Sequence, residues 1–268
     1  MMRQNSMDRH PTAYRRRSPP RIIIMADSLA MARPSISYDA TYPVLLQRSL
    51  YSRYGLRAPL VVEKAQRSRT IETVLRDWRE EVVVRKADIV VVHVGVVDCA
   101  PRVFSRREQI IINILGARLR QRILRFVHDH RSTIIRIRPS QVYASPERFR
   151  KAMQKIVRLA NQEGTCLILV NIVSPSDDLE QRSPGFQRNV AEYNTILESQ
   201  ADGRSVHVLD LNGIIWTQGG GKLLCEDGHH INAGGHRLLA RKLEHMILKE
   251  CLRISGGSAP RTGRSKPP

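Results

Sequence analysis

Short β-branched blocks alternate with longer amphipathic stretches across the middle of this chain. The blocks are Ile22–Met25, Leu60–Val62, Ile89–Val94, Leu167–Ile172 and Val206–Leu209. Blocks of this length with few polar residues are typical of strands buried on both faces, and the amphipathic stretches between them are long enough for helices. The alternation predicts one α/β domain over residues 21–252, in which helices cover a mostly parallel sheet.

Three helices can be placed from local signals. One should begin after Ser145, because a serine cap is followed there by Pro146, and should end before Gly164. A second long amphipathic helix is predicted for Glu108–Val127, and the last one from residues 232–235 to about residue 252. The segment Thr133–Ile137 is compatible with an extra strand or with a surface excursion, and the pattern does not decide between them.

The two ends of the chain lack this periodicity. Residues 1–20 and 253–268 are rich in Arg, Pro and polar residues. Such side chains do not form a hydrophobic core, so we expect both ends to be disordered tails. The apolar stretch after the basic N-terminus is too short for a signal peptide, and no run approaches the ~20 residues of a membrane span. The four cysteines are scattered, which indicates free thiols. We therefore expect a soluble, cytoplasmic protein without a transmembrane segment.

The charge is strongly positive, with 44 basic and 25 acidic residues and a net charge of +19. Such a field attracts polyanions. However, the arginines are spread along the chain and aromatic residues make up only 5%, without the basic and aromatic interleaving of single-strand binders. Specific nucleic-acid binding is therefore not expected, whereas an anionic substrate or peripheral contact with an anionic membrane stays open.

Candidate chemistry lies at two places. Ser28 follows the first predicted strand, at the edge where open α/β sheets gather their ligands, although a serine there is more often part of a turn or a helix cap. Asp227 and His230 precede the last predicted helix, and a carboxylate three residues before a histidine can fix the ring tautomer that makes it a base. The competing interpretation is a metal site built from Cys225, Asp227, His229, His230 and His236. Because no established zinc spacing is present, we predict no metal.

Three motifs in this order resemble those of the SGNH/GDSL hydrolases: Asp27-Ser28-Leu29, the stretch from Gly95 to Asp98, and Asp227 with His230. The resemblance spans residues 21 to about 250. It implies a three-layer α/β/α flavodoxin-like fold with a central parallel sheet of about five strands, and esterase activity without a cofactor. It further implies that Ser28 is the nucleophile and first oxyanion donor, His230 the general base and acid, and Asp227 its orienting carboxylate.

The chain departs from the family motifs at several positions. Ala26 replaces the first glycine, and the expected second block, residues 66–70, contains no glycine, so Ser68 or Arg69 would have to supply that oxyanion N–H. Val97 stands where the family has an asparagine donor, and losing one donor typically costs ~10²–10³ in rate. Arg102 is either a substitute donor, a contact for an anionic substrate or a plain surface arginine.

Gly95, Asp98 and Asn171 complete the predicted surroundings of the site. Gly95 and Asp98 belong to the third-strand motif, where Asp98 is expected to hold the loop through backbone N–H groups. Asn171 ends a predicted strand and is a candidate for the pocket lining. The resulting hypothesis is a serine esterase or acylhydrolase that acts on acylated substrates, including O-acyl groups on a carbohydrate. An acyltransferase with the same triad and a non-catalytic binding protein remain as alternatives.

Overall fold

The computed structural model describes residues 18–138 and 141–256. The predicted tails therefore lie mostly outside the described residues. At the C-terminal boundary the last helix continues to residue 256, so residues 253–256, which we predicted to be part of the tail, belong to that helix.

Five parallel strands form the central sheet, in the order β2-β1-β3-β4-β5. They are β1 Arg21–Ala26, β2 Leu60–Ala65, β3 Ile89–His93, β4 Cys166–Val170 and β5 Val206–Leu209. Each lies on one of the predicted β-branched blocks, with ends that differ by a few residues at most. The predicted mixed α/β fold with a five-stranded parallel sheet is confirmed.

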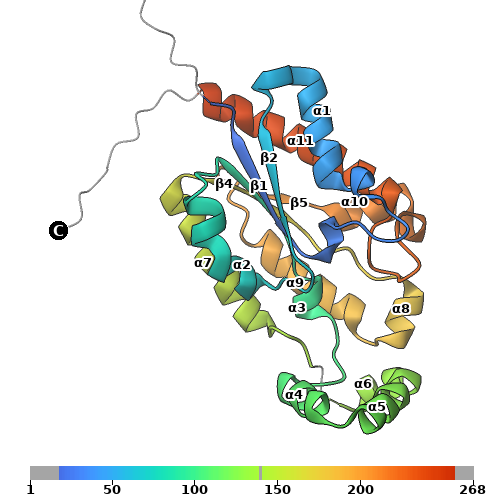
Figure 1. Cartoon of the computed structure of the whole chain (residues 1–268). Helices are drawn as coiled ribbons and strands as arrows, with labels where there is room; N and C mark the ends of the chain where they lie inside the picture. The colour runs from blue at the N-terminus through green and yellow to red at the C-terminus, as the bar shows by residue number, and fades with distance from the viewer. Residues whose placement is uncertain (1–17, 139–140, 257–268) are drawn as a thin grey trace, which may run out of the picture.

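Helices cover both faces of this sheet (Figure 1). Alternate residues of β1 enter separate hydrophobic cores: Ile23 and Met25 face one, Ile22 and Ile24 the other. The first core is completed by α2 Ile71–Trp78, α7 Pro146–Glu163 and α9 Phe186–Glu198. The second is completed by α1 Tyr42–Tyr54, α10 Leu211–Gln218 and α11 Ala233–Gly256. Because β1 is apolar on both sides, the sheet forms the middle layer of three.

Short elements connect these layers. They are η1 Ser28–Ala30, η2 Tyr38–Ala40, η3 Gly55–Arg57, η4 Arg79–Val83, α3 Val96–Cys99, α8 Asp177–Arg182 and η5 Gly220–Leu223. The prediction for α7 is confirmed: the Ser145 hydroxyl accepts a hydrogen bond from the Arg148 N–H at 3.4 Å, and Gly164 ends the helix in the left-handed conformation.

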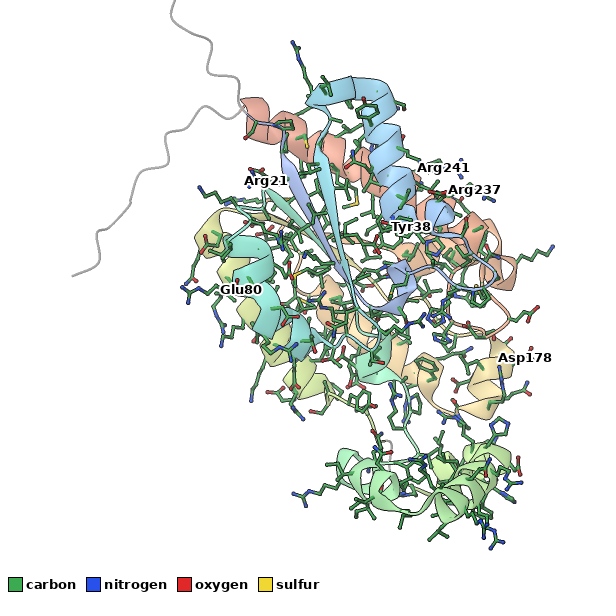
Figure 2. The ribbon with its side chains drawn as sticks, viewed as in Figure 1. Arg21, Tyr38, Glu80, Asp178, Arg237 and Arg241 are labelled. Atoms are coloured by element: carbon green, nitrogen blue, oxygen red, sulfur yellow. The ribbon has the colours of Figure 1, made fainter. Side chains whose placement is uncertain are left out.

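Three further helices leave the body of the molecule between α3 and α7. We call α4 Arg106–Ile114, α5 Ala117–Asp129 and α6 Arg131–Ile137 the helical excursion. The prediction of one helix over Glu108–Val127 was wrong, because Leu115 is extended and Gly116 begins α5 as its cap. The undecided segment Thr133–Ile137 is helical. Figures 1 and 2 show the excursion projecting from one end of the molecule.

No helix of residues 18–138 or 141–256 is long and apolar enough to cross a membrane.

Candidate active site

Ser28 is held at the carboxyl end of β1 by its neighbour Asp27. The Asp27 backbone N–H donates to the carbonyl oxygen of His93, the last residue of β3, at 3.1 Å. The Asp27 carboxylate accepts from the Leu29 N–H at 2.8 Å and so caps the short turn that begins with Ser28. Ala26 ends the strand, so the replacement of the family glycine costs no backbone strain here. These bonds place the half-buried Ser28 above the edge of the sheet.

The loop before α11 folds around the carboxylate of Asp227. Its Oδ1 accepts from the backbone N–H groups of His229 and His230, at 3.2 and 3.1 Å. Its Oδ2 lies 2.8 Å from Nδ1 of His230. An aspartate that binds the next backbone N–H groups fixes a tight turn, and this turn aims the His230 ring at Ser28.

The ring of His230 connects the two segments. Its Nε2 lies 3.0 Å from the hydroxyl oxygen of Ser28, although the two residues are 202 positions apart. If Nδ1 carries the proton that Asp227 accepts, Nε2 has a free lone pair for the Ser28 hydroxyl. Partial burial alone would raise the pKa of Asp227, but hydrogen bonds from the His230 ring and backbone outweigh it and hold that pKa below its usual range. Asp227 is thus an anion beside the His230 ring.

Arg33 contacts both members of this pair. Its guanidinium lies 3.3 Å from Oδ2 of Asp227 and also donates to Nε2 of His230, the nitrogen that faces Ser28. No pattern in the sequence singled out this residue, because it lies in a loop five positions after Ser28. Its contact with residues 227 and 230 arises only from the tertiary fold.

Comparison with protein families identifies the group to which this arrangement belongs. The model of the GDSL-like lipase/acylhydrolase family matches residues 27–238. The chain belongs to this family. The resemblance that we drew from the three motifs is therefore confirmed, and the chain is an ester-bond hydrolase by family. Among curated proteins, the comparison finds no match.

Solved structures of other hydrolases share the fold of this GDSL-like acylhydrolase. A lipase/acylhydrolase from Enterococcus faecalis has a TM-score of 0.61 and 17% identity, over 86% of this chain and 96% of the other. The acetyl xylan esterase AlAXEase has a TM-score of 0.60 and 16% identity, over 85% and 99%. A catalytic mutant of an acetylxylan esterase from Geobacillus stearothermophilus has a TM-score of 0.58 and 18% identity, over 86% and 94%.

A cavity of about 210 Å³ opens beside Ser28 in this family member. It lies where α3, α6, α8 and the start of α9 meet. Its lining consists of Ser28, Val96, Val97, Ala100, Pro101, Arg102, Arg131, Leu179, Ser183, Phe186 and His229. Its walls combine apolar and polar side chains in similar measure, and two arginines provide its fixed charge.

The two arginines of the cavity are held by neutral partners. Arg102 donates to the Val97 carbonyl at 3.2 Å and stacks on the Tyr143 ring, with 4.1 Å between the guanidinium carbon and the ring centroid. Arg131 donates to the Ser183 hydroxyl and the Pro101 carbonyl, both at 2.9 Å. Burial and the nearby positive charges of Arg102 and Arg182 lower the pKa of Arg131. Cations held together in this way favour a bound anion.

Asp98 is buried beneath the site. Its carboxylate oxygens accept from the Ile71 N–H at the start of α2, at 3.1 and 3.3 Å. Burial raises the pKa of Asp98 to about 8. Its backbone carbonyl receives the N–H groups of Tyr143 and Ala144. Asp98 therefore joins α2, α3 and the segment before α7, without contributing to the cavity wall.

The structure does not bring the remaining predicted site residues to the cavity wall. Asn171 donates to Asp210 at 2.8 Å and accepts from the Asn212 N–H at 2.9 Å, so both ends of its side-chain amide are used within the fold. It is not among the lining residues of this cavity, and its contact with a substrate stays a prediction. Ser68 is exposed in a turn after β2, and Gly95 caps α3.

Ser68 nevertheless has one feature that explains a glycine in the family motif. Its φ of 58° lies in the left-handed region, which glycine adopts without strain and serine rarely does. The Arg69 N–H closes the turn by donating to the Gln66 carbonyl at 3.2 Å. Arg69 itself is buried and paired with Asp77 at 2.7 Å.

Three of the five residues that we considered as metal ligands lie close together. Asp227, His229 and His230 could each direct one ligand atom to a common point, since those atoms lie within 4.8 Å of one another. However, the bond between Asp227 and His230 already uses one atom of each. His236 is separate, because its Nδ1 accepts from the Tyr42 N–H at 3.1 Å. Elsewhere in the fold, Cys166, His207 and Glu250 form a second group of the same kind.

Proposed function

We propose that this protein is a serine esterase in which Ser28 is the nucleophile, His230 the general base and acid, and Asp227 the residue that orients His230. One observation carries the proposal: the His230 ring lies between Ser28 Oγ and Asp227 Oδ2, at 3.0 and 2.8 Å. A serine hydroxyl is a weak nucleophile until a base within hydrogen-bond reach removes its proton.

In the proposed reaction, Nε2 of His230 takes the Ser28 proton while Oγ attacks the ester carbonyl. The imidazolium then returns that proton to the departing alcohol, which leaves an acyl group on Ser28. Water attacks this acyl-enzyme, His230 again takes and returns the proton, and a carboxylic acid is released. Asp227 remains ionised throughout, in keeping with its lowered pKa.

The oxyanion hole is the weakest part of this machinery. We infer that the Ser28 N–H is the first donor, and the Ser68 N–H, in its left-handed turn, is our candidate for the second. Val97 offers no side-chain donor to the cavity that it lines. A missing donor typically costs ~10²–10³ in rate, so we expect slow turnover of unactivated esters.

For the substrate, we infer an O-acyl group on a carbohydrate or a similar polar alcohol that carries a negative charge. Two of the proteins with this fold are acetylxylan esterases, which motivates the carbohydrate. Arg102 and Arg131, which line the cavity beside Ser28, motivate the charge. A guanidinium binds carboxylate and phosphate groups well because its donors match two acceptor oxygens.

The test of the mechanism is hydrolysis of aryl acetates to octanoates by wild type, Ser28→Ala and His230→Ala. We expect each substitution to lower kcat by at least about 10³. Ser52→Ala and His245→Ala change exposed residues of the same types on α1 and α11 and should leave kcat unchanged. Circular dichroism verifies that every variant is folded.

The possible outcomes separate the alternatives. Turnover that survives Ser28→Ala would rule out the proposed nucleophile. A folded wild type that forms no acyl-enzyme with any ester would instead favour a non-catalytic binding protein. An acyl-enzyme that forms but is resolved only by a sugar hydroxyl would identify an acyltransferase.

The charge preference is tested with two aryl acetates of nearly the same shape, the anionic 4-acetoxybenzoate and the neutral 4-acetoxybenzamide, each compared between wild type and variant. We expect wild type to prefer the anion in kcat/KM and Arg131→Met to reduce that preference about tenfold, with the amide turned over as before. Arg241→Met, on the exposed face of α11, is the matched control. An equal preference in wild type and Arg131→Met would contradict the anionic substrate and leave the triad untouched.

A further inference from the structure

The helical excursion exposes an unusual amount of apolar surface. Among the described residues, 15 large hydrophobic side chains are exposed, and seven of them lie in this segment of 32 residues. They are Ile110, Ile111, Ile114, Leu119, Leu124, Phe126 and Ile137. Ile114 and Ile137 are 78% and 77% exposed. Neither α4 nor α5 contains a buried residue among those described. Exposed apolar patches of this kind mark interaction surfaces.

The same segment is strongly basic. Residues 105–138 contain nine arginines and only two acidic residues. Arg118, Arg120, Arg122 and Arg125 are exposed along α5, and Arg136 is exposed on α6. Of the two acidic residues, Glu108 is paired with Arg138 at 2.7 Å. The exposed apolar side chains are thus surrounded by positive charge that the segment itself does not neutralise.

The combination of exposed aliphatic side chains and positive charge distinguishes between the partners that could bind the helical excursion. A second copy of the chain would bring like charges together, which opposes association. Single-stranded nucleic acid is bound by stacking on aromatic rings, whereas six of the seven exposed side chains are aliphatic. A basic amphipathic helix with aliphatic and Phe side chains matches the interface of an anionic bilayer.

We propose that the helical excursion binds the surface of membranes that contain anionic phospholipid. Its aliphatic side chains and Phe126 enter the boundary between headgroups and acyl chains, while the arginines of α5 contact lipid phosphates. The proposal does not depend on the catalytic role of Ser28. It does have a consequence for the site, because Arg131 at the start of α6 lines the Ser28 cavity. Docking would bring that cavity close to the lipid surface.

The experiment is co-sedimentation of the full chain with vesicles of phosphatidylcholine alone or of phosphatidylcholine mixed with phosphatidylglycerol. We expect binding to the anionic vesicles, little binding to the neutral ones, and a decrease in affinity as salt rises. Ile110→Asp with Ile114→Asp should weaken binding to anionic vesicles about tenfold or more. Arg122→Gln with Arg125→Gln should do the same by removing two charges near the phosphates.

Matched controls change similar residues elsewhere. Leu56→Asp alters a side chain that is 90% exposed outside the excursion. Arg237→Gln with Arg241→Gln removes two arginines from α11, which Figure 2 shows in the part of the molecule away from the excursion. Both controls should bind like wild type. Aryl acetate turnover and circular dichroism show whether each variant is folded.

Three results would overturn the proposal. One is equal binding by wild type and both excursion variants, which would assign binding to another basic part of the chain. The second is the absence of binding to anionic vesicles. The third is a dimer in light scattering that Ile110→Asp with Ile114→Asp dissociates while vesicle binding is unchanged, which would assign the apolar surface to a second copy.

Discussion

Two side chains compete for one lone pair at the centre of the site. The Ser28 hydroxyl and the Arg33 guanidinium both reach Nε2 of His230. An imidazolium beside a guanidinium is unfavourable, so in the mechanism that we propose Arg33 would have to withdraw from Nε2 before His230 accepts the Ser28 proton. The guanidinium could keep its ion pair with Asp227 while it moves away from Nε2. In the proposed mechanism, entry of an anionic substrate would promote this withdrawal by offering Arg33 another partner.

At the same scale, a substitution at Val97 tests the oxyanion hole that we propose. Val97→Asn introduces a side-chain donor at the position where the family motif has one. We expect kcat for aryl acetates to rise by about tenfold or more, within the ~10²–10³ attributed to one donor, with little change in KM. Steady-state kinetics check this expectation.

Val96→Asn is the matched control, because Val96 is adjacent and lines the same cavity. It should not raise kcat. Equal kcat values for wild type and Val97→Asn, in folded protein, would mean that another group already fills the oxyanion hole.

At the scale of elements, the sheet was predictable because its strands are largely buried on both faces and therefore appear as β-branched blocks. Asp227 and His230 were predictable because their contact lies within one turn. The break between α4 and α5 was not, because the apolar pattern continues through Leu115 and a single glycine is tolerated in many helices. Arg131 is separated from Ser28 by about a hundred residues, so only the fold brings it to the cavity.

The turn from β3 into α3 depends on Gly95. Its φ is +128°, and a Cβ atom there would lie 2.6 Å from Cδ1 of Ile172. We predict that Gly95→Ala lowers the free energy of unfolding by roughly 2–4 kcal/mol, through backbone strain and overpacking. Urea denaturation monitored by circular dichroism measures this loss.

Gly116→Ala is the control for this substitution. Gly116 has a φ of −55°, and a Cβ atom added there would meet no other atom within 4 Å. Because alanine is a poorer helix cap than glycine, its unfolding free energy should decrease slightly, by less than about 1 kcal/mol. A similar small effect of Gly95→Ala would show that the turn relaxes around the added methyl group.

At the scale of the whole molecule, the site exists only when the sheet is complete. Ser28 follows the first strand and His230 precedes the last helix, so their 3.0 Å contact requires both hydrophobic cores to be formed.

The carboxyl group of Asp27, next to Ser28, is also buried only when the whole domain is folded. Burial raises the pKa of Asp27 to about 7, and one of its oxygens has no hydrogen-bond partner among the described residues. Ionisation of this group therefore opposes folding of the entire domain.

The sign of this effect predicts how stability depends on pH. In the unfolded chain Asp27 releases its proton near its ordinary pKa of about 3.9, whereas the folded chain retains it until about pH 7. The contribution of this group to the free energy of unfolding is therefore complete below about pH 4 and is lost as pH rises to about 7. Asp27→Asn keeps the acceptor for the Leu29 N–H and cannot ionise. We predict that its stability relative to wild type increases between pH 4 and pH 7, by roughly 4 kcal/mol at most.

Urea denaturation of wild type and Asp27→Asn at about pH 5 and about pH 8 measures this difference. The control is Asp178→Asn, which changes an exposed carboxylate. A difference between Asp27→Asn and wild type that is the same at both pH values would show that Asp27 is ionised in the folded protein throughout this range.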